Sequence, residues 1–145
     1  MKMTALVMVV LLAACSAVAQ VSYIFTTVDV PGSVLTRAHN IDRQGDIVGL
    51  FDYVKGVGHG FLVHNGTFTQ IDFPASTFTS ARGINSTGQI AGGYADVNNI
   101  DHGFLLINGQ YTSFDYPGST MTDAYDIDDA GVVVGDYVDT VGVLH

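Results

Sequence analysis

The sequence predicts an all-β protein made of tandem four-stranded antiparallel repeats that are propeller-like, and three observations support this. An ungapped period of 43 residues carries the same residue at nine positions in all three copies, which is typical of stacked or circular repeat architectures. All fourteen acidic residues are Asp, which favours turns, and none is Glu, which favours helices. Seventeen glycines also indicate many tight turns. The nine positions are Asp29, Pro31, Ser33, Thr36, Ala38, Ile41, Gly45, Gly49 and His59, with their equivalents 43 and 86 residues later.

One copy, taken from His59, contains four short strand patterns. The predicted strands cover residues 60–63, 67–71, 79–84 and 89–94. Asn65-Gly66 joins the first two, and this dipeptide is the strongest short signal for a hairpin. Pro74 then ends the pattern, because proline has no N–H to donate to a sheet. Small residues at the Ala38 and Gly49 positions are expected to let neighbouring sheets stack closely.

Four short strands in 43 residues favour propeller blades over a β-solenoid, which is the alternative architecture. The predicted organisation is an export signal at 1–19, a partial first repeat at 20–58, a second at 59–101 and a truncated third at 102–145. The residues after position 19 amount to about 2.9 repeats, whereas propellers typically close with about 4 to 8 blades. Residues 25–28 match the second strand of a copy. We therefore expect further repeats of a longer protein, or self-association, to complete the fold.

The first 19 residues have the pattern of a bacterial export signal. Lys2 precedes an apolar run, and Ala17-Val18-Ala19 is a small-residue cleavage site, so cleavage is expected between Ala19 and Gln20. Leu12 to Cys15 also resembles a lipobox, and cleavage there would make Cys15 a lipid-modified N-terminus and give the protein its only membrane contact. Both alternatives predict a secreted or cell-envelope protein, periplasmic or extracellular.

The charge balance excludes one class of partner. Without Lys2 the chain has four basic and fourteen acidic residues, a formal net charge of −10. Phosphate binding needs clustered Lys and Arg, so we expect no nucleic-acid partner.

Several motifs resemble the bacterial extracellular repeat family called the HAF family. The matching stretches are His59-Gly-Phe-Leu62, Asn65-Gly66, Gly83 to Tyr94, His102-Gly-Phe-Leu105 and Asn108-Gly109. The family's His-Ala-Phe is His-Gly-Phe here, and an Asp-x-Pro segment replaces its Gly-rich segment after the second strand. The resemblance implies export and a repeat architecture, and it implies no catalytic residue.

Two sets of residues are candidate metal ligands. Asp126 and Asp128 echo the start of a calcium loop, but Ala130 occupies its fifth position and the closing Glu is missing. The His59 series recurs in every copy and is interpreted as part of the blade, bonded to a neighbouring turn. His39 and His64 fall outside that series and are interpreted as surface residues. We expect no cofactor, with calcium at Asp126 and Asp128 as the alternative.

No catalytic constellation is visible. The Asp29 series recurs in all copies before Pro and is interpreted as capping its own turn, whereas catalytic carboxylates are normally singular. The expectation is a non-enzymatic binding or structural module for a surface polymer or protein. The alternative is a fragment of an extracellular polysaccharide-acting hydrolase or lyase, with its catalytic residues outside this chain. The candidate binding residues lie in the loops that vary most between copies, and they are Tyr53, Lys55, Asp96, Asn98, Asn99 and Asp101.

Overall fold

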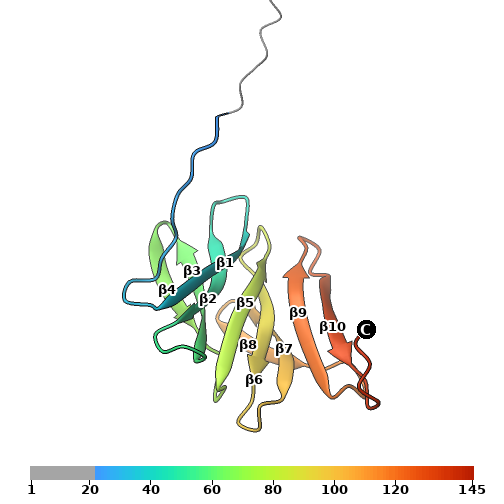
Figure 1. The fold of residues 1–145 in the computed structure, drawn as a ribbon. Coiled ribbons are helices and arrows are strands. Elements are labelled where there is room, and N and C mark those ends of the chain that lie inside the picture. The colour runs from blue at the N-terminus through green and yellow to red at the C-terminus, as the bar shows by residue number, and fades with distance from the viewer. Residues whose placement is uncertain (1–21) are drawn as a thin grey trace, which may run out of the picture.

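The computed structural model describes residues 22–145, which form ten β-strands (Figure 1). The expected export signal, the Ala19–Gln20 cleavage site and Cys15 lie outside the described residues. Within 22–145 the structure has no helix long and apolar enough to span a membrane. The strands are β1 (Leu35–Ile41), β2 (Ile47–Asp52), β3 (Gly58–His64), β4 (Thr67–Ile71), β5 (Phe78–Ile84), β6 (Ile90–Ala95), β7 (Asp101–Ile107), β8 (Gln110–Phe114), β9 (Met121–Ile127) and β10 (Val133–Val138).

The strands form three antiparallel sheets, each following the order of the chain. Two sheets have four strands, β1–β4 and β5–β8, and β9 pairs with β10 in the third. The prediction of an all-β protein with tandem four-stranded repeats is therefore confirmed. Figure 1 shows the sheets side by side, with β5–β8 between the other two.

The grouping of strands into sheets differs from the sequence prediction by two strands. The predicted repeat begins at His59, but β3, which contains His59, pairs with β2 before it, and the sheet ends at Ile71. The Asp-x-Pro turn carries the chain to the next sheet. The strand expected near residues 25–28 is also absent, since residues 22–34 contain no strand. β4 and β8 are held by pairing with β3 and β7, and residues 25–28 have no such partner among the described residues.

The sheets stack through apolar side chains and one small residue. β5 contacts β1, β2 and β3, and β9 contacts β5, β6 and β7. Ala81 and Ala124 are fully buried, and a Cβ added at Gly60 would lie 3.5 Å from that of Ala81. The small residue of the Ala38 series therefore permits close stacking, as expected. The largest core cluster lies between the first two sheets and comprises Val48, Ile71, Ala81, Ile84, Ile90 and Phe104.

The Gly49 series has a different role from the one expected. A Cβ at Gly92 would lie 2.1 Å from the Ser80 carbonyl oxygen and 2.7 Å from the Phe104 ring. Ser80 is on the strand paired with β6 in the same sheet, next to a β-bulge. Glycine is therefore required by the close approach of strands within one sheet and by the ring above it, rather than by stacking between sheets.

The repeated Asp-x-Pro-x-Ser segment is a turn held by the repeated threonine. The Thr79 hydroxyl oxygen accepts the Phe73 N–H at 3.1 Å and lies 2.9 Å from the Ser76 hydroxyl. The first and third copies make the equivalent bonds. The residue after Pro has φ near +80° in two copies, where it is Gly, and φ +61° in the second copy, where it is Ala75.

Sheets that are not neighbours in sequence also meet. The Asn40 side-chain amide of β1 donates to the Asp126 carboxylate of β9 at 2.9 Å. Gly83 on β5 lies close to the same part of β9, because a Cβ added there would be 2.6 Å from the Asp126 Cα. The first strands of the three sheets, β1, β5 and β9, thus converge, and we call them the inner strands. Convergence of first strands is the arrangement of propeller blades, although the described residues form no closed ring.

Candidate functional site: the inner-strand cavity

The inner strands alternate between repeated and variable residues. Thr36 and Ala38 are the same in every copy, whereas the positions between and after them differ. The first variable position holds Arg37, Ser80 and Asp123, and the second holds His39, Arg82 and Tyr125. The second variable position is the residue that a β-bulge leaves unpaired in each of the three sheets, so its side chain does not follow the simple alternation of a regular strand.

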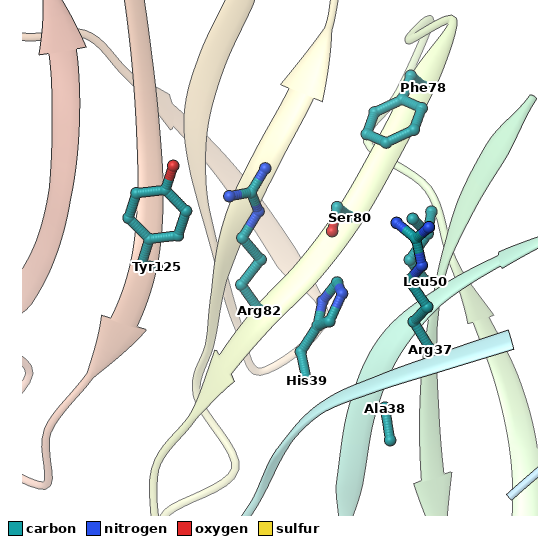
Figure 2. Close-up of a pocket in the computed structure, with 8 residues that line it drawn as sticks. All are labelled: Arg37, Ala38, His39, Leu50, Phe78, Ser80, Arg82 and Tyr125. Carbon is teal, nitrogen blue, oxygen red and sulfur yellow. The ribbon is translucent and has the colours of Figure 1, made fainter. Parts of the chain in front are cut away.

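The two variable positions border a cavity of about 560 Å³, which we call the inner-strand cavity. It is lined by Arg37, Ala38, His39, Leu50, Phe78, Ser80, Arg82 and Tyr125. Figure 2 shows His39 between the two arginines and Tyr125 beside Arg82. Five of the variable inner-strand residues named above therefore gather around one space.

The two arginines of the cavity are in different states. Arg37 is exposed and makes no ion pair with any residue of the described range 22–145. Arg82 is three-quarters buried, and its Nη2 lies 2.6 Å from Asp123 Oδ2. Its guanidinium carbon also lies 4.6 Å from the centre of the Tyr125 ring, within the range of a cation–π contact. The Arg82 Nε is buried without a hydrogen-bond partner.

His39 connects the first two sheets. Its Nδ1 lies 3.0 Å from the carbonyl oxygen of Ala81, and a carbonyl only accepts, so Nδ1 carries the proton. Burial lowers the pKa of His39, with smaller contributions from Arg82 and Arg37. The neutral ring leaves Nε2 as an acceptor beside the cavity.

Asp123 lies on the far side of Arg82, in a second cavity of about 300 Å³ that also borders Asp101. Burial raises its pKa to about 6, and the nearby Asp136 and Asp101 carboxylates add to this against the lowering effect of Arg82. Gly93 makes room for the side chain, because a Cβ there would overlap Asp123 Oδ1. Buried Oδ1 atoms of Asp123 and Asp136 have no hydrogen-bond partner. The charge of Arg82 is thus only partly balanced at acidic pH.

The loop residues predicted to bind a ligand lie at one end of the sheets, away from the inner-strand cavity lining. Tyr53 is 48% exposed and packs edge-on against Phe51. Asp96 holds its own turn, accepting the N–H groups of Asn98 at 2.7 Å and Ile100 at 2.9 Å. Asn99 has φ +58° in that turn.

Lys55 is exposed in the loop between β2 and β3. Asp101, at the start of β7, borders the second cavity near Arg82. Of the six predicted residues, it alone lies beside the charged residues of the inner strands.

The calcium candidates are engaged in the backbone of the turn. Asp128 Oδ1 accepts the N–H groups of Ala130 and Val132, and Asp126 Oδ1 accepts from Asn40 and its own following N–H. Residues 22–145 contain no group of three or more His, Cys, Asp or Glu side chains placed to hold a metal ion. These contacts favour the hairpin-turn interpretation of the motif.

The repeated histidines and aspartates form pairs within the sheets. His59 Nδ1 lies 3.0 Å from Asp72 Oδ2, and His102 Nδ1 lies 2.8 Å from Asp115 Oδ1. The His102 ring also stacks on Tyr94 at 5.1 Å. In these two pairs the aspartate bonds to the histidine rather than capping its own turn, whereas the third histidine, His145, lies 3.2 Å from Asp139. The turn is held by Thr and Ser instead.

Sequence reasoning missed the variable inner-strand residues, apart from noting His39 as a surface residue. His64 is exposed, and its Nδ1 lies 2.6 Å from Asp46. His39 is accessible to solvent by surface area, but its ring is partly buried against the Ala81 carbonyl and lines the cavity. A signal was present in the sequence: positions 37 and 39 change charge from copy to copy while 36 and 38 do not.

Comparison with known proteins gives no relative: no family model, curated protein or solved structure matches the chain.

Proposed function

We propose that this protein is a non-enzymatic β-repeat binding module of an exported bacterial protein of the HAF-repeat type, and that it holds its ligand at the inner-strand cavity. The proposed ligand is a surface polymer or another protein outside the cytoplasm. The observation that carries this proposal is that repeated and variable residues of the inner strands have different roles. Repeated residues make the turns and the stacking, and variable polar residues meet at one cavity.

Binding sites are commonly concave, with a few convergent polar groups on a preformed scaffold. The inner-strand cavity combines Arg37, His39 and Ser80 with the apolar Leu50 and Phe78. Because these side chains project from strands rather than from long loops, the site is held rigidly. The export pattern at 1–19 and the formal net charge of −9 favour an extracellular polymer over a nucleic acid.

A binding screen tests the proposal. The purified chain is incubated with an array of bacterial and plant polysaccharides, and the double variant Arg37→Ala/Tyr125→Ala is run beside it. We expect the wild-type chain to bind at least one polymer and the variant to lose that binding. The triple loop variant Tyr53→Ala/Lys55→Ala/Asn98→Ala serves as the matched control and should bind as wild type does. Binding lost in the loop variant and kept in the cavity variant would contradict the proposed site.

A further inference from the structure

Positive charge is concentrated at one place in an acidic protein. Two of the four Lys and Arg residues within 22–145, Arg37 and Arg82, line the inner-strand cavity, and no carboxylate lines it. The chain has a formal net charge of −9. A general solubility role spreads charge over a surface, whereas two guanidinium groups share this cavity. Asp123 balances the charge of Arg82, and no carboxylate of residues 22–145 forms an ion pair with Arg37.

We propose that the inner-strand cavity binds an acidic saccharide, with the carboxylate of a uronate unit held between Arg37 and Arg82. This deepens the proposed function by naming the ligand class, and it rests on that proposal for the location of the site.

The donors of the cavity suit a carboxylate. A guanidinium presents a planar fork of N–H groups that matches a carboxylate in geometry. The guanidinium of Arg37 forms no ion pair with a carboxylate of residues 22–145, so all of its N–H groups remain for a ligand carboxylate. Arg82 uses Nη2 for Asp123 and its Nε is buried, so Nη1 is the donor that remains for a ligand. The Arg82 position is fixed by this pair and by the Tyr125 ring, so little side-chain entropy is lost on binding.

The rest of the lining suits a saccharide ring. The cavity, at about 560 Å³, is far larger than a bare carboxylate. Phe78 offers apolar surface to the C–H face of a sugar, with the buried Leu50 beside it, and His39 Nε2 offers a partner to its hydroxyl groups, with the buried Ser80 hydroxyl at the cavity wall. An inorganic anion would leave this apolar surface without contacts.

The test uses calorimetric titration of the full chain with digalacturonate, and with the uncharged galactose disaccharide of the same linkage as the comparison. We expect digalacturonate to bind at least about ten-fold more tightly than the neutral sugar, because a hydrogen bond between two charged groups is stronger than one between neutral groups. The affinity should fall as salt is added.

Arg37→Gln is the informative variant, since Arg37 makes no ion pair whose loss would disturb the fold, and it should weaken digalacturonate binding about ten-fold. Arg43→Gln is the matched control: Arg43 is an exposed arginine 3.8 Å from Asp129 on a turn, and its loss should leave binding unchanged. Circular dichroism of both variants verifies the fold.

The outcomes separate this inference from the proposed function. Neutral and acidic sugars bound equally at a site sensitive to Tyr125→Ala would overturn the acidic ligand and keep the binding site. A glutamate-rich peptide bound as tightly as digalacturonate would overturn the saccharide. Equal loss in the Arg37 and Arg43 variants, or no binding of digalacturonate at millimolar concentration, would overturn the inference itself.

Discussion

Replacing Asp123 with Asn tests the electrostatics beside the inner-strand cavity. The pKa of this carboxyl is about 6 in the folded protein against an ordinary value of 3.8, with burial as the main cause. This pKa difference corresponds to about 2 to 3 kcal/mol in the free energy of unfolding, at 1.36 kcal/mol for each tenfold change in proton affinity. Asn keeps the shape of the protonated carboxyl without its ability to ionise.

The sign of the effect follows from the direction of the pKa change. The folded protein holds the proton more tightly than the unfolded chain, so the contribution of Asp123 to stability is greatest below pH 3.8. This contribution is lost as the pH rises from 3.8 through 6, and above that pH the effect of Asp123 on stability no longer changes. We therefore expect Asp123→Asn to match the wild type near pH 4 and to be more stable by about 2 to 3 kcal/mol at pH 7.5.

Urea unfolding followed by circular dichroism, at intervals between about pH 4 and 8, measures this difference. His39, whose pKa is lowered by burial, and Asp96, Asp129 and Asp139, whose pKa values are lowered by hydrogen bonds, titrate in both proteins. The difference between the two proteins therefore reports Asp123 together with its interaction with the Asp136 and Asp101 carboxylates. Asp128→Asn is the control, because Asn85 occupies the equivalent position and the Asp123 carboxyl is retained. A variant that is less stable than the wild type at pH 7.5, or a difference independent of pH, would refute the reasoning.

Three further substitutions test the repeat turns and sheets by the same urea measurement. Ala75→Gly should stabilise the protein by about 0.5 to 1 kcal/mol, because φ +61° strains an alanine; a destabilised variant would contradict the positive φ. Gly92→Ala should cost about 3 kcal/mol or more, since the new Cβ would lie 2.1 Å from a backbone carbonyl oxygen; an unchanged midpoint would show that the strands can separate. Thr79→Val should cost about 1 to 3 kcal/mol by leaving the Phe73 N–H without its acceptor, and no loss would mean that water replaces the hydroxyl.

The strands and turns were predictable from the sequence because local signals determine them. Asn65-Gly66 lies between β3 and β4, and Asn65 has φ +50° and Gly66 φ +75°, as a type I′ turn requires. The assignment of β3 to the sheet of β2 was not predictable from the period, because a repeat of 43 residues has no intrinsic starting point. That choice depends on which turn breaks the ladder, and it is the proline turn at Pro74.

The candidate site was less predictable. Loop variation pointed to Asp96 and Asn98, whose side chains in fact hold their own turn. Arg82 and Tyr125 are 43 residues apart, and only the stacking of β5 against β9 brings them to 4.6 Å. A pairing across sheets is a tertiary property, and the sequence alone shows only that their shared repeat position is free to vary.

The most direct test of the inner-strand cavity as the ligand site is a ¹H–¹⁵N NMR titration of the chain with digalacturonate. We expect chemical-shift changes to cluster on the inner strands at Arg37, His39, Ser80, Arg82 and Tyr125. Shifts confined to the loops that contain Tyr53, Lys55, Asp96 and Asn98 would contradict the cavity as the ligand site. They would indicate that the ligand binds these variable loops instead.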